Sequence, residues 1–301
     1  MYKSPDIPVI NVPGNEKEPE RFFKLYRLKN TPADEEGLSY ARFKTNVPHR
    51  HHFYEILIFD QASGMHEIDF ISYPVKSRNI HFISPGQVHY LSVTNDSHGY
   101  ILAFSDEFYT QYEYNKSGIV HYPFFQSVRK NILQLSEEQF QKASAIIPFI
   151  LHEYKQQPNP EILHTYLKAL MLELQRIYEF HYKDTGATIQ EDRILRHFLQ
   201  ILEKEFKSKK PVGEYADMLT IHTGILNSAV KKITGKTTGE LILERIILEA
   251  KRLLHHSSLS QKEIAYELNF EDPSYFSRIF KRKTNFSPSE FREQVGKKYK
   301  Q

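Results

Sequence analysis

The sequence of 301 residues contains no cysteine, which excludes disulfides, thiolate catalysis and cysteine-ligated zinc. It has no apolar run approaching the ~20 residues that a membrane-spanning helix needs. Its first residues, MYKSPDIPVI, lack the charged-then-apolar order of a signal peptide. No Ser-His-Asp grouping, phosphate-binding loop or pair of carboxylates stands out. We therefore expect a cytoplasmic protein that is not an enzyme, with no catalytic residues and no cofactor.

Charge is distributed unevenly along the chain, although the formal net charge is only +3. Residues 190–301 hold 21 Lys and Arg against 15 Asp and Glu, a net charge of +6. The remainder holds 19 against 22, a net charge of −3. A basic C-terminal part on a slightly acidic N-terminal part is expected if only one end meets a polyanion, although a solvated surface alone can also carry this charge.

The N-terminal part predicts β-structure. Residues 1–20, rich in Pro, Asn and Glu, predict an extended arm. Within residues 21–104, aromatic and β-branched runs predict strands at Phe53 to Phe59, Ile68 to Tyr73, Ile80 to Ile83 and Tyr100 to Phe104. Turn signals stand at Ser63-Gly64, Ser84-Pro85-Gly86 and Asn95-Asp96. Short strands at close spacing indicate a small sandwich or barrel.

Helices are expected over residues 136–182, where Ser136 is a candidate N-cap. The segment after Pro160 has apolar residues in the spacing of a two-helix seam, at Leu163, Leu167, Leu170, Leu174 and Ile177. We expect a homodimer through helix 161–178, and the same spacing also fits a helix packed on its own barrel. Residues 183–190 predict a linker to a C-terminal domain at 191–301.

One helix-turn-helix pattern occurs twice in the last third of the chain. A shift of 49 positions relates Glu214, Ala216, Leu219 and Ile221 to Glu263, Ala265, Leu268 and Phe270. A shift of 50 then relates Leu226, Val230, Lys231 and Thr234 to Phe276, Phe280, Lys281 and Thr284. Two such units joined by a helix predict a bipartite reader of double-stranded DNA.

Helix ends in this region are marked by their capping residues. Thr237 with Glu240, Ser260 with Glu263, and Ser287 with Glu290 are capping boxes, and Asp272-Pro273 places an N-cap before a proline. We expect helices at 212–219, 223–232, 261–268 and 273–283.

The exposed faces of the two predicted recognition helices differ. Arg278 in the second unit is the best base reader, because a guanidinium can bond bidentately to guanine. The first unit offers small side chains and a glycine, Gly224, so we expect it mainly to anchor the protein. The predicted DNA-binding residues are Thr223, Asn227, Ser228, Lys231, Lys232, Ser274, Ser277, Arg278, Lys281 and Arg282.

Residues 191–301 resemble the DNA-binding domain of the AraC family of bacterial transcription regulators. The resemblance is carried by EYADMLTIHTGILNSAVKKITGKTTGELILERIILEAKRLL and EIAYELNFEDPSYFSRIFKRKTNFSPSEFR. The chain departs from the family at Asn285, where a glycine usually ends the recognition helix, and at Gly224, where a larger side chain is usual. Asparagine also tolerates the left-handed conformation needed at Asn285.

The stretch PHRHHFYEILIFDQASGMHEID…HFISPGQVHYL is similar to the cupin-type sensing barrel of many family members. The resemblance implies an α+β, two-domain protein: a cupin-like effector and dimerisation domain at 21–182, with the barrel to about 125, and an all-α DNA-binding domain. Aromatic residues are abundant in the barrel and fit either an effector cavity or plain core: Phe43, Phe53, Tyr54, Phe59, Phe70, Tyr73, Phe82 and Tyr90. The expected effector-binding residues are His49, His51, Glu55, His66 and His89.

The order of His49, His51, Glu55 and His89 also matches the cupin metal site, a mixed nitrogen and oxygen set that suits Fe, Mn, Ni or Zn. Pro85 and Gly86 are adjacent where metal cupins usually have one residue between them, and we expect no metal here. Our leading interpretation is an effector-responsive, DNA-binding transcription regulator. A metal-dependent cupin enzyme with an appended DNA-binding domain, and a regulator with a purely structural barrel, are the alternatives. The residues do not identify the effector, the operator or the sign of regulation.

Overall fold

The computed structural model describes residues 22–28, 47–113, 118–126, 130–182, 188–208 and 211–298. These residues belong to two compact units, an N-terminal unit up to residue 182 and a C-terminal unit from residue 188. The predicted arm, residues 1–20, lies outside the described residues. Of the predicted linker, residues 188–190 are described, and they start a helix: Thr188 is the N-cap of α5 (Ile189–Glu205).

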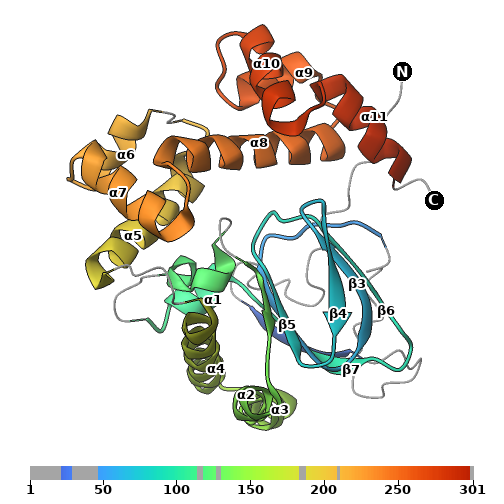
Figure 1. Ribbon diagram of the computed structural model, residues 1–301. Coiled ribbons are helices and arrows are strands. Elements are labelled where there is room, and N and C mark those ends of the chain that lie inside the picture. The colour runs from blue at the N-terminus through green and yellow to red at the C-terminus, as the bar shows by residue number, and fades with distance from the viewer. Residues whose placement is uncertain are drawn as a thin grey trace. The chain divides into compact units, whose positions relative to one another are not determined.

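Two antiparallel sheets form the β-structure of the N-terminal unit (Figure 1). The larger sheet has the order β1-β7-β2-β5-β8, with β1 (Phe23–Leu28), β7 (His98–Phe104), β2 (Tyr54–Gln61), β5 (Asn79–Ile83) and β8 (Ile132–Gln134). The smaller sheet has the order β4-β3-β6, with β4 (Ile71–Lys76), β3 (Ser63–Ile68) and β6 (His89–Val93). Strands followed by a helical C-terminal unit confirm the predicted fold class.

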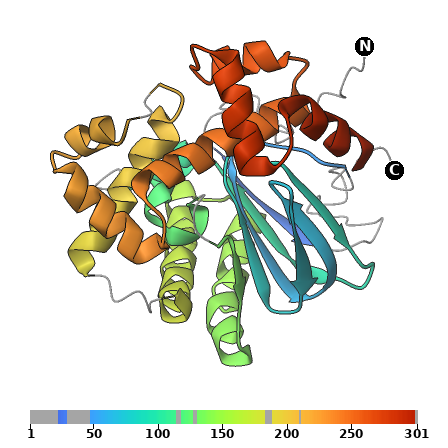
Figure 2. The same cartoon turned by 45° about the horizontal axis from the view of Figure 1, so that its top comes forward.

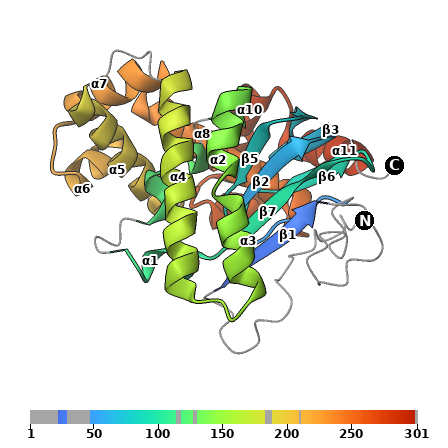
Figure 3. The same cartoon turned by 90° about the horizontal axis from the view of Figure 1, so that it is seen from below.

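Side chains of the larger sheet alternate between two cores, as the pleat of a strand requires. In β2, Ile56 and Ile58 lie in a core that also contains helix residues, whereas Leu57 and Phe59 lie in a core shared with the smaller sheet. Helices therefore cover one face of the larger sheet, and the smaller sheet faces the other (Figure 3). Glu55 lies on the same face of β2 as Leu57 and Phe59, because side chains alternate along a strand. Its carboxylate is therefore directed between the sheets.

The structure corrects two sequence predictions near β3. The predicted strand Ile68 to Tyr73 is wrong, because β3 ends at Ile68 and β4 begins at Ile71. The two residues between them, Asp69 and Phe70, have φ of 47° and 72° and form a tight turn that contains no glycine. The predicted turn at Ser63-Gly64 is wrong as well, since both residues lie in β3. A Cβ on Gly64 would lie 2.1 Å from the Ser92 carbonyl oxygen, so glycine permits close strand approach here.

The helices of the N-terminal unit follow its strands. They are α1 (Asp106–Thr110), η2 (Ile119–His121), η3 (Pro123–Phe125), α2 (Glu137–Ser144), α3 (Ile147–Lys155) and α4 (Pro160–Tyr182). Ser136 caps α2 as predicted, with Gln139 completing a capping box. The five apolar residues of the predicted α4 seam are all buried in the core under the larger sheet. These five residues therefore pack inside the subunit and are not available for contact with a second chain.

The C-terminal unit consists of helices in two groups joined by α8 (Thr238–His256), which Figures 1 and 2 show as one long element. The first group contains α5, α6 (Val212–Met218) and α7 (Thr223–Thr234), and the second contains α9 (Gln261–Glu267), α10 (Pro273–Thr284) and α11 (Pro288–Lys298). The predicted helices are confirmed within two residues at their ends. No helix among the described residues is long and apolar enough to cross a membrane.

Candidate DNA interface and buried histidine cluster

The second helix-turn-helix unit has the ends that its sequence predicts. Asp272 Oδ1 accepts a hydrogen bond from the Ser274 backbone N–H at 2.7 Å, and Pro273 occupies the first position of α10. The helix ends at Asn285, whose φ of 66° is left-handed and whose N–H donates to the Lys281 carbonyl. These caps define where α10 begins and where it ends.

The outer face of α10 carries the predicted contacts. Phe276, Ile279 and Phe280 are buried, while Ser274, Arg278, Lys281 and Arg282 are exposed and Ser277 is half-buried. Arg278 has 73% of its side chain exposed, and its Nη2 lies 3.8 Å from Asp272 Oδ2. An exposed pair of this kind contributes little to stability, so the guanidinium can exchange Asp272 for a guanine edge.

The first unit presents a different surface. Thr223, Gly224, Ser228 and Lys231 are exposed on α7, and a Cβ at Gly224 would meet no atom within 4 Å. Folding therefore does not require glycine at this position. Without a side chain, Gly224 offers no base-reading group near the start of α7.

Two of the predicted contacts in the first unit are engaged within the protein. Asn227 Oδ1 accepts a hydrogen bond from the Thr238 N–H at 3.1 Å, at the start of α8. A bidentate adenine contact uses both atoms of the amide, so it would have to break this bond. Lys232 Nζ lies 2.8 Å from Glu191 Oε2 of α5, in a partly exposed pair that a phosphate can replace.

Sequence reasoning missed one pair of exposed apolar residues. Ile225 on α7 and Tyr275 on α10 are each about half exposed, and they are 50 positions apart. The same 50-residue shift that relates the two units would have paired them. Apolar side chains at the start of a recognition helix can contact thymine methyl groups.

Arg245, a buried arginine of α8, joins this helix to α5 of the first group. Arg245 Nε donates to Glu203 of α5 at 2.8 Å, and Arg245 Nη1 donates to Glu249 at 3.0 Å. The guanidinium also lies 3.8 Å above the Phe206 ring. At 19 residues, α8 is about 28 Å long, close to one groove repeat of DNA.

The N-terminal unit gathers its candidate effector residues in one place between the two sheets. The histidine and glutamate side chains predicted from the sequence are all buried there: His49, His51, Glu55, His66 and His89. His81 of β5 is buried with them and was missed, although strand alternation at Leu57 and its partner His81 places it on the inner face. The structure brings these side chains together, and their binding of an effector stays a prediction.

The cluster is connected by hydrogen bonds between rings. His66 Nδ1 lies 2.9 Å from His81 Nδ1, and His66 Nε2 lies 3.2 Å from His89 Nδ1. His51 Nδ1 donates to the Phe53 carbonyl at 2.8 Å. Burial lowers the pKa of the His49, His66 and His89 imidazoles and lowers that of His81 to about 3. These four rings are therefore neutral near pH 7.

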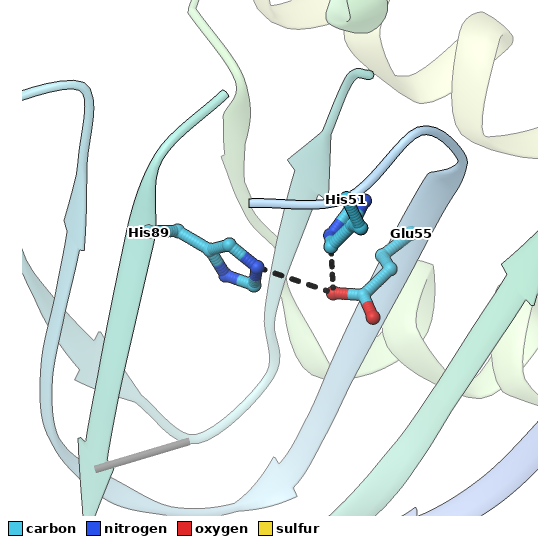
Figure 4. A group of neighbouring side chains, drawn as sticks. All are labelled: His51, Glu55 and His89. Carbon is cyan, nitrogen blue, oxygen red and sulfur yellow. Dashed lines mark ion pairs between the residues drawn. The ribbon is translucent and has the colours of Figure 1, made fainter. Parts of the chain in front are cut away.

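Three members of the cluster point toward one another (Figure 4). His51 Nε2 and His89 Nε2 lie 3.4 and 3.9 Å from Glu55 Oε2. One atom from each of these residues lies within 4.8 Å of the other two, a grouping with the dimensions of a metal site. His49 makes a different contact, through Nδ1 to the Val47 carbonyl at 3.0 Å. The site geometry thus contains three, and not four, of the residues that the sequence pattern suggested.

The aromatic residues expected to line an effector cavity serve several packing roles. Tyr54 and Phe82 lie in the core under the helices, and Phe53 and Phe59 lie in the core between the sheets. Phe70 is in the β3–β4 turn. Phe43 lies outside the described residues.

Comparison with known proteins finds similarity over the C-terminal helices and, more weakly, over most of the chain. Residues 215–294 match a helix-turn-helix domain. The chain is 22% identical over 259 residues to the HTH-type transcriptional activator RhaS of Escherichia coli, covering 81% of this chain and 87% of RhaS. RhaS of Salmonella paratyphi A is 24% identical over 257 residues with the same coverage. ToxT from Vibrio cholerae is a structural neighbour with 17% identity and a TM-score of 0.40, over 91% of this chain and 98% of ToxT.

Proposed function

We propose that this chain, a DNA-binding transcription regulator with a helix-turn-helix domain of the AraC type, binds duplex DNA with two unequal recognition helices. Helix α10 specifies the sequence and α7 mainly anchors the protein. The observation that carries this proposal is the contrast between Arg278, exposed on α10, and Gly224, which has no side chain, on the exposed face of α7. The asymmetry follows because base edges carry sequence information and phosphates do not.

The proposed contacts divide by chemistry. Arg278, with Ser274 and Ser277 beside it, reads base edges in the major groove. Lysine and arginine side chains at the ends of both helices neutralise phosphates: Lys231, Lys232, Lys281 and Arg282. Thr223 and Ser228 donate hydrogen bonds to the backbone. Asn227 retains its Nδ2 for DNA while its oxygen caps α8.

We also propose a homodimer, formed by the outer face of α4 in place of the predicted seam. An exposed stripe on this helix has three-four-three spacing, at Ile162, Thr165, Ala169 and Leu172. Phe149 of α3 is exposed as well, and its ring lies 5.8 Å from that of Tyr166 on α4. A row with large apolar residues at its ends and the small residues Thr165 and Ala169 between them suits an antiparallel helix pair with a second copy.

The N-terminal unit is proposed to sense an effector through the buried histidine cluster. Buried polar atoms without a hydrogen-bond partner are costly in a core, and a bound ligand is one way to satisfy them. His51 Nε2, Glu55 Oε2 and His89 Nε2 are such atoms. By similarity to its named relatives we propose that the protein activates transcription, in the cytoplasm where its DNA target lies.

In vitro selection of duplex DNA bound by the full-length chain tests the proposed function. We expect enrichment of one motif with two contacted segments about one helical turn apart. Selection in the presence of a metabolite mixture should change the enrichment if the effector proposal is right. Recovery of random sequences, with binding that depends only on salt, would contradict specific DNA recognition.

A further inference from the structure

We infer that the first turn of α7 binds the methyl group of one thymine in the major groove, with Gly224 and Ile225 as the contacting residues. Among the four bases, thymine alone presents a methyl group there. This inference rests on the proposed DNA-binding function and adds a base that the first recognition helix reads by shape. A methyl contact is weaker than a bidentate guanine contact, so the unequal division between the two helices is unchanged.

Glycine at position 224 is not explained by the fold of the protein. Gly224 lies in the first turn of α7, and its φ is not in the left-handed region. A Cβ there would meet no atom within 4 Å, so no neighbour in the described residues requires its absence. Glycine also makes a helix less stable than alanine does, because it loses more backbone entropy on folding. A glycine that packing does not need is typical of a place where the backbone approaches a ligand closely.

Ile225 stands beside this open position as an exposed apolar side chain. It is 48% exposed, whereas the other exposed side chains of α7 are polar or charged: Thr223, Ser228, Lys231 and Lys232. A single exposed apolar residue is common on protein surfaces. This one lies at the end of the helix that is proposed to enter the groove, and its β-branched side chain has few rotamers to lose on binding. These properties suit an apolar contact with a base.

The residues around Gly224 complete the contact surface. Residues three and four apart are neighbours on a helix, so Asn227 and Ser228 lie next to Gly224 over the following turn. The Asn227 side chain is held in place by the bond from the Thr238 N–H at 3.1 Å. A base methyl about 3.5–4.0 Å from the Gly224 Cα is in ordinary van der Waals contact with it. An added Cβ would occupy that place.

The second unit differs at the same two positions. The 50-residue shift leads from them to Ser274 and Tyr275 of α10. Ser274 already has a Cβ, and the Tyr275 ring has neighbours of its own. Its centroid lies 6.3 Å from that of the Phe270 ring and 5.9 Å from the Arg278 Cζ. We therefore assign the methyl contact to α7 and expect the thymine in the DNA segment that this helix occupies.

Duplexes that contain deoxyuridine test the inference with the full-length chain. Deoxyuridine pairs as thymidine does and lacks only the methyl group, and it replaces in turn each thymine of the duplex enriched by in vitro selection. We expect one replacement, one helical turn from the segment read by Arg278, to lower affinity roughly two- to four-fold, the effect of burying about one methyl group. Equal affinity for all of these duplexes would overturn the inference and leave the DNA-binding proposal intact. Selection that enriches no motif would contradict both.

Gly224→Ala should remove this preference for thymine. Its new methyl group takes the place of the thymine methyl, so affinity for the thymine duplex should fall about five-fold or more, as overpacking predicts. The deoxyuridine duplex leaves room for the Cβ and should bind at least as tightly as the thymine duplex. Ile225→Ala should bring the ratio of the two affinities close to one without a new clash.

Gly213→Ala is the matched control, because Gly213 lies in α6 and a Cβ there also meets no atom within 4 Å. This variant should keep the wild-type ratio of thymine to deoxyuridine affinity. The melting temperatures of both glycine variants should equal or exceed that of the wild type, since alanine restricts the unfolded chain more than glycine does. A Gly224→Ala protein that keeps the wild-type ratio would refute the contact, and so would an equal loss of the ratio in Gly213→Ala.

Discussion

Asn227 accepts a hydrogen bond from the backbone N–H of Thr238 at 3.1 Å, which ties the first recognition helix to the start of α8. The equivalent residue of the second unit, Ser277, instead donates to the Pro273 carbonyl of its own helix at 3.0 Å. The two units thus share a buried skeleton and use their polar side chains differently. We propose that the first unit anchors the protein and the second specifies the sequence, and the tie between Asn227 and α8 supports the first of these roles.

The Asn227 bond predicts a stability effect. Asn227→Ala should lower the free energy of unfolding by about 0.5–2 kcal/mol, the usual cost of losing a helix N-terminal hydrogen bond. Urea unfolding of the full-length protein measures the change. DNA sequence preference should be retained in the same variant. A shifted base preference without any loss of stability would show that Asn227 is a reader and not a cap.

Arg278 is predicted to carry base specificity. Arg278→Ala should cost about 1–3 kcal/mol of binding free energy on the selected site and should relax preference at one base position. Fluorescence anisotropy with the selected duplex and its single substitutions measures both effects. If the variant keeps its full discrimination at every position, Arg278 does not read a base.

Lys281 is predicted to bind phosphate without regard to sequence. Lys281→Ala should weaken binding to all duplexes alike and reduce the slope of log K against log salt by about 1. The control is Lys142→Ala, since Lys142 lies in the N-terminal unit and is paired with Glu138. An effect confined to one sequence would mean that Lys281 specifies.

Helix α4 gives a pair of neighbouring leucines with opposite expected effects. Leu170 is fully buried in the chain's own core, and Leu172 is 50% exposed. Leu170→Ala should lower stability by about 2–5 kcal/mol. Leu172→Glu should leave the stability of the subunit unchanged and halve the molar mass measured by light scattering. A dimer that survives Leu172→Glu would exclude the outer face of α4 as the interface.

The helical part of the fold could be predicted from sequence because its signals are local. Capping residues such as Asp272 and Ser260 fix helix ends within a few residues, and the 50-residue shift identifies the second unit. The partners of polar side chains could not be predicted, since they depend on packing between distant elements. Lys232 meets Glu191 of α5, and Asn227 meets α8, contacts that no short pattern contains.

The β-structure was less predictable for the same reason. The Asp69-Phe70 turn has no glycine or proline to mark it, and it interrupts a run that reads as one strand.

The histidines illustrate both outcomes. The spacing of His51 and Glu55 indicated a cluster, but His81 joins it only through the pairing of β5 with β2. Cross-strand register, which the sequence does not state, decides such cases.

The central claim is that the two recognition helices contribute unequally to specificity. Measuring the binding free energy of the full-length protein for every single base-pair substitution in its selected site tests this most directly. We predict costs of about 1–3 kcal/mol per substitution in the segment that loses discrimination in Arg278→Ala. We predict costs several-fold smaller in the segment one helical turn away. Equal costs in both segments would contradict the account.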